Sequence, residues 1–128
     1  MYAKDITTRE EITELMQPGG PAAIIDFWAA WCGPCRAMAP HFEEAARQME
    51  EEEVTFYKLD TQKYPELAKA FNVRSLPTVM AIHDGQIQDV FIGARDAHSL
   101  TQIAKTLVSR ASGEGFLKLI FGGNNKAS

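Results

Sequence analysis

The sequence has few cysteines, no surplus of positive charge and no long apolar run, and each shortage excludes a class of protein. With 13 Lys and Arg against 17 Asp and Glu, its formal net charge is −4, which offers no cationic surface for nucleic acid. No apolar run approaches the ~18 residues of a membrane helix, and residues 1–11 lack the apolar core of a signal peptide. We therefore expect a cytoplasmic single-domain protein without nucleic-acid or membrane partners.

The two cysteines, Cys32 and Cys35, are the chain's clearest chemical signal. They follow an apolar, strand-like run over residues 22–29 and precede a helix-patterned stretch. A helix N-terminus stabilises a thiolate, which is the nucleophilic form of cysteine. A Cys-x-x-Cys pair at such a junction in a cytosolic chain indicates a thiol–disulfide redox centre. A secreted protein held together by disulfides would usually carry more than one pair.

A metal site is the alternative role for these cysteines. Structural zinc usually takes four ligands, commonly from two ligand pairs. The chain has one cysteine pair, and its three histidines are not at a ligand-pair spacing: His41, His83 and His98. We therefore expect a redox-active Cys32–Cys35 disulfide, no metal and no bound cofactor.

The remaining pattern predicts an α/β fold with a mixed central sheet and helices on both faces. Helices are expected from residue 8 to 16, from the cysteines to 49, from 65 to 71 and from 96 to 110, and strands over 22–28, 54–59, 78–82 and 87–92. The strand–helix–strand opening favours parallel pairing. Asp84-Gly85 between two strand-like runs predicts a hairpin.

With these elements placed, the chain closely resembles the thioredoxin family from about Ile6 to Arg110. The resemblance rests on Asp26-Phe27-Trp28, Trp31-Cys32-Gly33-Pro34-Cys35, Pro40, Leu76-Pro77-Thr78 and Gly93. It implies a thioredoxin fold, reduction of exposed protein disulfides and re-reduction by a thioredoxin reductase. We expect a thioredoxin domain over residues 1–111, a monomer, and a C-terminal extension over 112–128 of unknown role.

Within the motif, Cys32 is the expected nucleophile and Cys35 the resolving thiol. Cys32 begins the helix, where water reaches it and the helix end lowers its pKa, whereas Cys35 lies nearly one turn further in, toward the core. Gly33 and Pro34 set the geometry and redox poise, since Pro34 fits the first helical turn and adds no charge or proton. By resemblance, a Gly-Pro pair favours a reductant.

Asp26 interrupts an apolar strand, so we expect it to be buried with a raised pKa. A polar residue facing outward from an edge strand is the alternative. By resemblance Asp26 accepts the proton of Cys35, and Lys58 on the neighbouring strand tunes its pKa. Without the resemblance, the alternative for Lys58 is a solvated lysine on its strand.

Residues expected to contact substrate surround the cysteines: Trp31, Leu76, Pro77, Gly93 and Ala94. Trp31 lies in a turn and is expected at the surface, whereas Trp28 is expected to pack. By resemblance the Leu76–Pro77 bond is cis, and Leu76 pairs with an extended substrate. Gly93 either admits a substrate backbone or only ends its strand.

Two functions compete with protein-disulfide reduction: a non-enzymatic interaction module with the same fold, and a disulfide isomerase. A module would not need a resolving thiol. The extension departs from the family pattern, because five of its residues from 116 to 121 are apolar. We expect it to fold back as an extra strand or short helix, or to contact a partner or a second copy.

Overall fold

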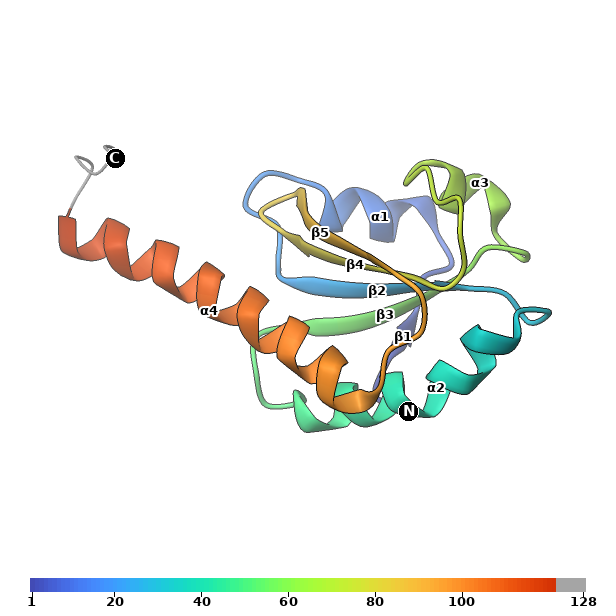
Figure 1. Ribbon diagram of the computed structural model, residues 1–128. Coiled ribbons are helices and arrows are strands. Elements are labelled where there is room, and N and C mark those ends of the chain that lie inside the picture. The colour runs from blue at the N-terminus through green and yellow to red at the C-terminus, as the bar shows by residue number, and fades with distance from the viewer. Residues whose placement is uncertain (122–128) are drawn as a thin grey trace.

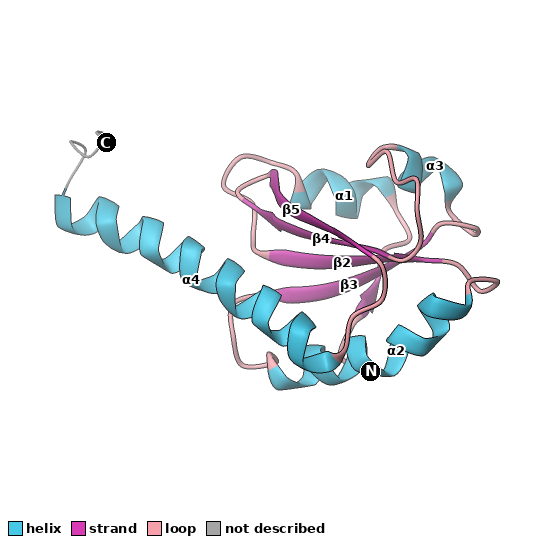
Figure 2. Cartoon of the chain, in the orientation of Figure 1, coloured by secondary structure: helices cyan, strands magenta, loops and turns pink. Residues whose placement is uncertain are grey.

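The chain forms the expected α/β architecture, a mixed five-stranded sheet between two layers of helices (Figures 1 and 2). The computed structural model describes residues 1–121, with side chains described up to residue 113. In chain order the elements are β1 (Lys4–Asp5), α1 (Arg9–Leu15), β2 (Ala23–Trp28), α2 (Gly33–Gln48), β3 (Thr55–Asp60), α3 (Pro65–Lys69), β4 (Thr78–His83), β5 (Gln86–Ile92) and α4 (Ala97–Phe121).

The sheet order is β1-β3-β2-β4-β5, which places β2 at the centre. β2 pairs in parallel with β3 and antiparallel with β4. All of its residues except Trp28 are buried, as expected for a strand covered on both faces. β4 and β5 form the predicted hairpin, in which Asp84 and Gly85 both have positive φ angles of 59° and 69°, as a type I′ turn requires.

The helices bury two separate apolar clusters against the sheet. α2 and α4 lie together on one face (Figure 1) and pack Met38, Phe42 and Leu100 against the strands. α1 and α3 lie on the other face and pack Leu15 and Leu67 there. Residues of β2 alternate between the two clusters, so this strand forms the middle of the core.

Two elements differ from the sequence-based prediction. The first is β1, which the sequence did not predict and which pairs in parallel with β3 through Lys4 and Asp5. The second is α4, which does not end near Arg110. It continues as one helix to Phe121 and extends away from the sheet (Figure 1).

The expected fold-back of the extension as an extra strand or short helix is therefore wrong for residues 112–121. Glycine weakens a helix interior by about 1 kcal/mol but does not stop it, and this stretch contains no proline. Residues 122–128 lie outside the described part of the chain. Within that part, no helix combines the length and apolarity needed to cross a membrane.

Candidate active site

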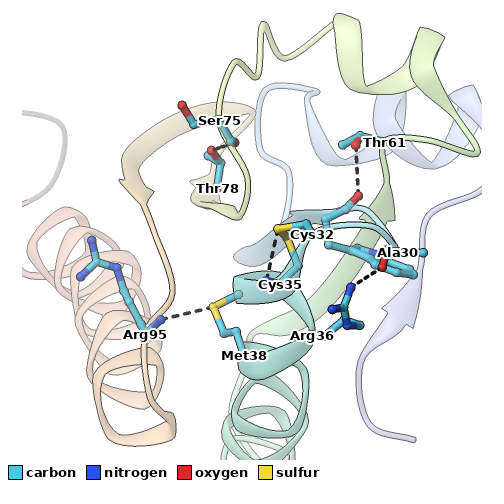
Figure 3. Close-up of a disulfide and its surroundings, with 10 residues drawn as sticks. Ala30, Cys32, Cys35, Arg36, Met38, Thr61, Ser75, Thr78 and Arg95 are labelled. Carbon is cyan, nitrogen blue, oxygen red and sulfur yellow. Dashed lines mark hydrogen bonds between the residues drawn. A yellow bond between two sulfur atoms is a disulfide. The ribbon is translucent and has the colours of Figure 1, made fainter.

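The two cysteines form a disulfide at the N-terminus of α2, directly after the central strand (Figure 3). Cys32 is the N-cap residue, with extended backbone angles, and Gly33 and Pro34 begin the helix. The backbone N–H of Cys35 donates to the Cys32 sulfur at 3.3 Å. Pro34 lacks an N–H of its own, a loss that the first helical turn tolerates because its amides have no intrahelical partner. The Cys32 sulfur thus occupies the place of a capping oxygen.

Cys32 is less exposed to solvent than the sequence predicted, and Cys35 is buried as well. In the oxidised state Cys32 is 4% exposed and Cys35 is 2% exposed. The expectation that water reaches Cys32 freely does not hold in this state, because Ala29, Trp28 and Leu76 pack against the pair. Cys35 lies in the first turn of α2, whose inner face continues into the core through Met38.

Asp26 is fully buried in the central strand, which confirms the expected burial and excludes the edge-strand alternative. Burial raises the pKa of its carboxyl from 3.8 to about 7, and the positive charge of Lys58 opposes that rise. Neither carboxylate oxygen has a hydrogen-bond partner among the described residues. A buried carboxyl with a pKa near neutrality can take up or release a proton under physiological conditions.

Lys58 lies directly beside Asp26, because the two residues are register partners in the parallel β2–β3 pair. Its ammonium nitrogen lies 4.8 Å from the centre of the Trp28 ring, within the range of a cation–π interaction. Lys58 also lines a cavity of about 260 Å³ together with Trp28 and Asp60. The side chain therefore links the buried carboxyl to a more open region.

The expected substrate-contacting residues lie around the disulfide on three loops. Trp31 is 67% exposed, which confirms its predicted surface position. The Leu76–Pro77 bond is cis, as the resemblance implied. The N–H of Gly93 donates to the Pro77 carbonyl at 2.9 Å, which joins the loop after β5 to the loop before β4. Ala94, next to Gly93, is exposed.

Gly93 follows the end of β5 and has a φ of +100°, a conformation that residues with a side chain rarely adopt. A Cβ atom at this position would meet nothing within 4 Å. Backbone conformation is therefore sufficient to explain the glycine. The open space beside it is also consistent with the close approach of a substrate.

Sequence reasoning missed three contacts that fix the loops around the disulfide (Figure 3). Arg36 reaches back from α2 and donates to the Ala30 carbonyl at 2.7 Å. The N–H of Arg95 donates to the Met38 sulfur at 3.4 Å. Thr61 donates to the Trp28 carbonyl at 3.1 Å. The Arg36 contact spans six residues and ends before α2 begins, and the other two join residues far apart in sequence, so no helix or strand spacing signalled them.

The described residues contain no group of three or more His, Cys, Asp or Glu side chains placed to hold a metal ion. The two sulfurs are bonded to each other in this state, so neither is present as a thiolate ligand.

Comparison with known proteins identifies one family. The family model described as thioredoxin matches residues 4–106. Thioredoxin 1 of Synechococcus elongatus is 40% identical over 90 residues, which cover 70% of this chain and 79% of the relative. A thioredoxin of Mycoplasmoides gallisepticum is 34% identical over 102 residues, which cover 80% of this chain and 99% of the relative.

Solved structures agree with these relatives. The crystal structure of the Malassezia sympodialis thioredoxin superimposes with a TM-score of 0.73 at 28% sequence identity. The superposition covers 83% of this chain and 90% of that one. The likeness therefore extends over most of both chains.

Proposed function

We propose how Cys32, Cys35 and Asp26 share the reaction of this chain, which belongs to the thioredoxin family and is a protein-disulfide reductase. The family and the paired thiols are the basis for the activity, and the roles of individual residues are our proposal. The observation that carries these roles is the contact between the Cys35 N–H and the Cys32 sulfur at the N-cap of α2.

Cys32 is the nucleophile. In the reduced protein a Cys32 thiolate accepts the same amide hydrogen bond, and a charged acceptor at a helix N-terminus is stabilised both by that bond and by the helix dipole. The thiolate attacks one sulfur of the substrate disulfide. A mixed disulfide forms, and the other substrate sulfur leaves as a thiolate.

Cys35 resolves the mixed disulfide, and Asp26 accepts its proton. The Cys35 thiolate attacks the Cys32 sulfur, the second substrate thiolate leaves, and the protein ends in the oxidised state described above. Two electrons pass to the substrate in total. Supporting the role of Asp26 are its complete burial and a pKa raised to about 7, which match a group that must exchange a proton near neutral pH.

The surrounding residues position the substrate and tune the thiols. Trp31, Leu76, Pro77, Gly93 and Ala94 form the contact surface, in keeping with their places on the three loops around the disulfide. Gly33 and Pro34 set the redox poise, and Lys58 tunes Asp26 through its charge.

The cellular setting is also part of the proposal. The protein acts as a monomer in the cytoplasm, passes electrons to proteins with exposed disulfides, and is recharged by a thioredoxin reductase without a bound cofactor. A reducing dithiol suits a compartment where disulfides rarely persist. The catalytic domain spans residues 1–111, and 112–128 form an extension, in keeping with a family match that ends at residue 106.

Trapping the mixed disulfide tests the roles of the two thiols. Cys35→Ser is expected to accumulate a covalent complex with an oxidised substrate protein such as insulin, and dithiothreitol should release it. Cys32→Ser is expected to form little complex and is the matched control. Equal trapping by both variants, or a complex with Cys32→Ser alone, would overturn the assignment.

The pH dependence of resolution tests Asp26. Asp26→Ala is expected to slow decay of the mixed disulfide and to remove the dependence on a group that titrates near pH 7, the pKa of its carboxyl. Wild-type rates throughout the neutral range would contradict the role of Asp26.

The midpoint potential of the Cys32–Cys35 pair tests whether the protein is a reductant or an isomerase. A potential at or below about −250 mV, close to the roughly −270 mV of thioredoxins, supports a cytoplasmic reductant. A value nearer −180 mV, typical of disulfide isomerases, would support the isomerase instead.

A further inference from the structure

A cavity of about 480 Å³ opens beside the disulfide, between the Trp31 loop, α3 and the loop that leads into β4. Its lining residues are Trp31, Thr61, Pro65, Glu66, Ala68, Lys69, Val73, Arg74 and Leu76. Five of these nine residues are apolar, and three carry charge. None of the charged residues has a part in the reaction described above.

The cavity adjoins the reacting sulfurs directly. Leu76 belongs both to its lining and to the apolar cluster around Cys32 and Cys35. Trp31 immediately precedes Cys32 and covers one side of the cavity. A substrate chain held at the disulfide can therefore extend over this opening.

The charges in the cavity are mainly positive, in contrast to the chain as a whole. Lys69 and Arg74 oppose the single carboxylate of Glu66, and all three residues are exposed. The complete sequence carries a formal net charge of −4. Arg36 adds a further cation on the α2 side of the Trp31 loop, where it is bonded to the Ala30 carbonyl (Figure 3). Positive charge thus gathers beside the thiols of an acidic protein.

We propose that this cavity binds an acidic side chain, Asp or Glu, that lies within a few residues of the reacting cysteine in the substrate protein. The apolar wall formed by Trp31, Val73 and Leu76 covers the aliphatic part of that side chain, and Lys69 and Arg74 face its carboxylate. The cavity then selects acidic disulfide segments. This inference deepens the proposed function and rests on it.

An extended chain brings such a side chain within reach. It advances about 3.3 Å per residue, and successive side chains point to opposite faces. A residue one or two positions from the substrate cysteine can therefore enter the cavity while the cysteine stays at Cys32. Because the cations are exposed, each contributes about a 1.4- to fivefold preference, the range of a surface ion pair.

Peptide disulfides that differ only in flanking charge test the proposal. Three peptide dimers, each joined by one cysteine disulfide, are compared. They carry Glu, Gln or Lys at both of the two positions on each side of the cysteine. The pre-reduced full-length protein is mixed with each peptide, and the released peptide thiol gives the second-order rate constant. Each constant is divided by that for dithiothreitol, which corrects for the peptide's own reactivity.

The wild-type protein is expected to reduce the Glu peptide about three- to tenfold faster than the Lys peptide, with the Gln peptide between them. The preference should decrease as salt rises from about 0.02 to about 0.5 M, because exposed charges are screened. Lys69→Gln combined with Arg74→Gln should bring the Glu-to-Lys ratio close to one. Glu66→Gln should increase the ratio.

Lys105→Gln removes one positive charge on the exposed side of α4 and is the matched control, for which the wild-type ratio is expected. A ratio unchanged by the Lys69 and Arg74 substitutions, or fastest reduction of the Gln peptide, would overturn the cavity's acidic preference. Failure to reduce any of the peptides would instead contradict the proposed reductase function.

Discussion

Asp26 on β2 and Lys58 on β3 are paired in register across the parallel strands, so the most buried carboxyl in the described sheet has a cation as its direct neighbour. The pairing does not keep the carboxyl ionised, because desolvation outweighs the attraction of Lys58 and the pKa of Asp26 rises to about 7. The protein therefore retains a protonated aspartic acid in its core at mildly acidic pH.

In the oxidised state, the stability of Asp26→Asn relative to the wild type is expected to increase as pH rises. From pH 3.8 to about 7 the folded wild type holds a proton that the unfolded chain releases, so wild-type stability falls with rising pH. The variant lacks this loss. Its advantage should grow by ~1.4 kcal/mol per pH unit in that window and then level off.

Denaturant unfolding at a series of pH values, with the disulfide kept oxidised, measures this difference. The two proteins should differ by a constant amount below about pH 3, where Asp26 is neutral in both the folded and the unfolded wild type. A difference independent of pH from 4 to 8 would show that the carboxyl is not shifted.

Lys58→Gln should raise the pKa of Asp26 above about 7, because the substitution removes the one charge that lowers it. Titration of the carboxyl carbon by NMR in the oxidised protein measures the change. Lys63→Gln is a suitable control, since Lys63 lies over the Tyr64 ring instead. An unchanged or lower Asp26 pKa in the Lys58 variant would contradict the electrostatic role.

Thr8→Ala should destabilise the protein by about 1 kcal/mol, the usual loss for a helix N-cap. The Thr8 hydroxyl accepts from the Glu11 N–H, and the Glu11 carboxylate accepts from the Thr8 N–H, which together form a capping box. Thr8→Ser retains the hydroxyl and should remain within a few tenths of a kcal/mol of wild type. Equal losses in both variants, measured by urea unfolding, would argue against the cap.

Removal of residues 112–128 is expected to change the free energy of unfolding by less than about 1 kcal/mol, as for changes outside a packed core. Among the α4 side chains that the structure describes, the last buried one is Leu107. Urea unfolding of the shortened chain and measurement of its disulfide reductase activity test this boundary. A loss of several kcal/mol would place part of the extension in the domain.

Local signals in the sequence were sufficient for most of the fold. Thr8 with Glu11 predicted the start of α1, and Asp84-Gly85 predicted the hairpin turn, because each feature depends only on neighbouring residues. β1 has two residues and no apolar alternation, and it forms only because Tyr57 and Lys58 offer a partner. Such a strand depends on tertiary pairing and leaves no local pattern.

In the candidate site, too, local features could be predicted from the sequence, whereas features that depend on tertiary structure could not. Burial of Asp26 could be predicted from its apolar neighbours, whereas the cis bond before Pro77 came from the family resemblance alone. The cavity beside Trp31 was not predicted. It arises where α3 meets the loop before β4, so residues distant in sequence, such as Trp31 and Arg74, form one lining.

The central position of β2 has a consequence for motion. Strands paired on both sides break their backbone hydrogen bonds only in the rarest openings, so β2 amides are expected to exchange with deuterium among the slowest in the molecule. The cysteine loop begins directly where this strand ends. The reactive sulfurs are thus anchored to the stiffest part of the chain, and the conformational adjustment needed for sulfur–sulfur contact falls chiefly on the partner protein.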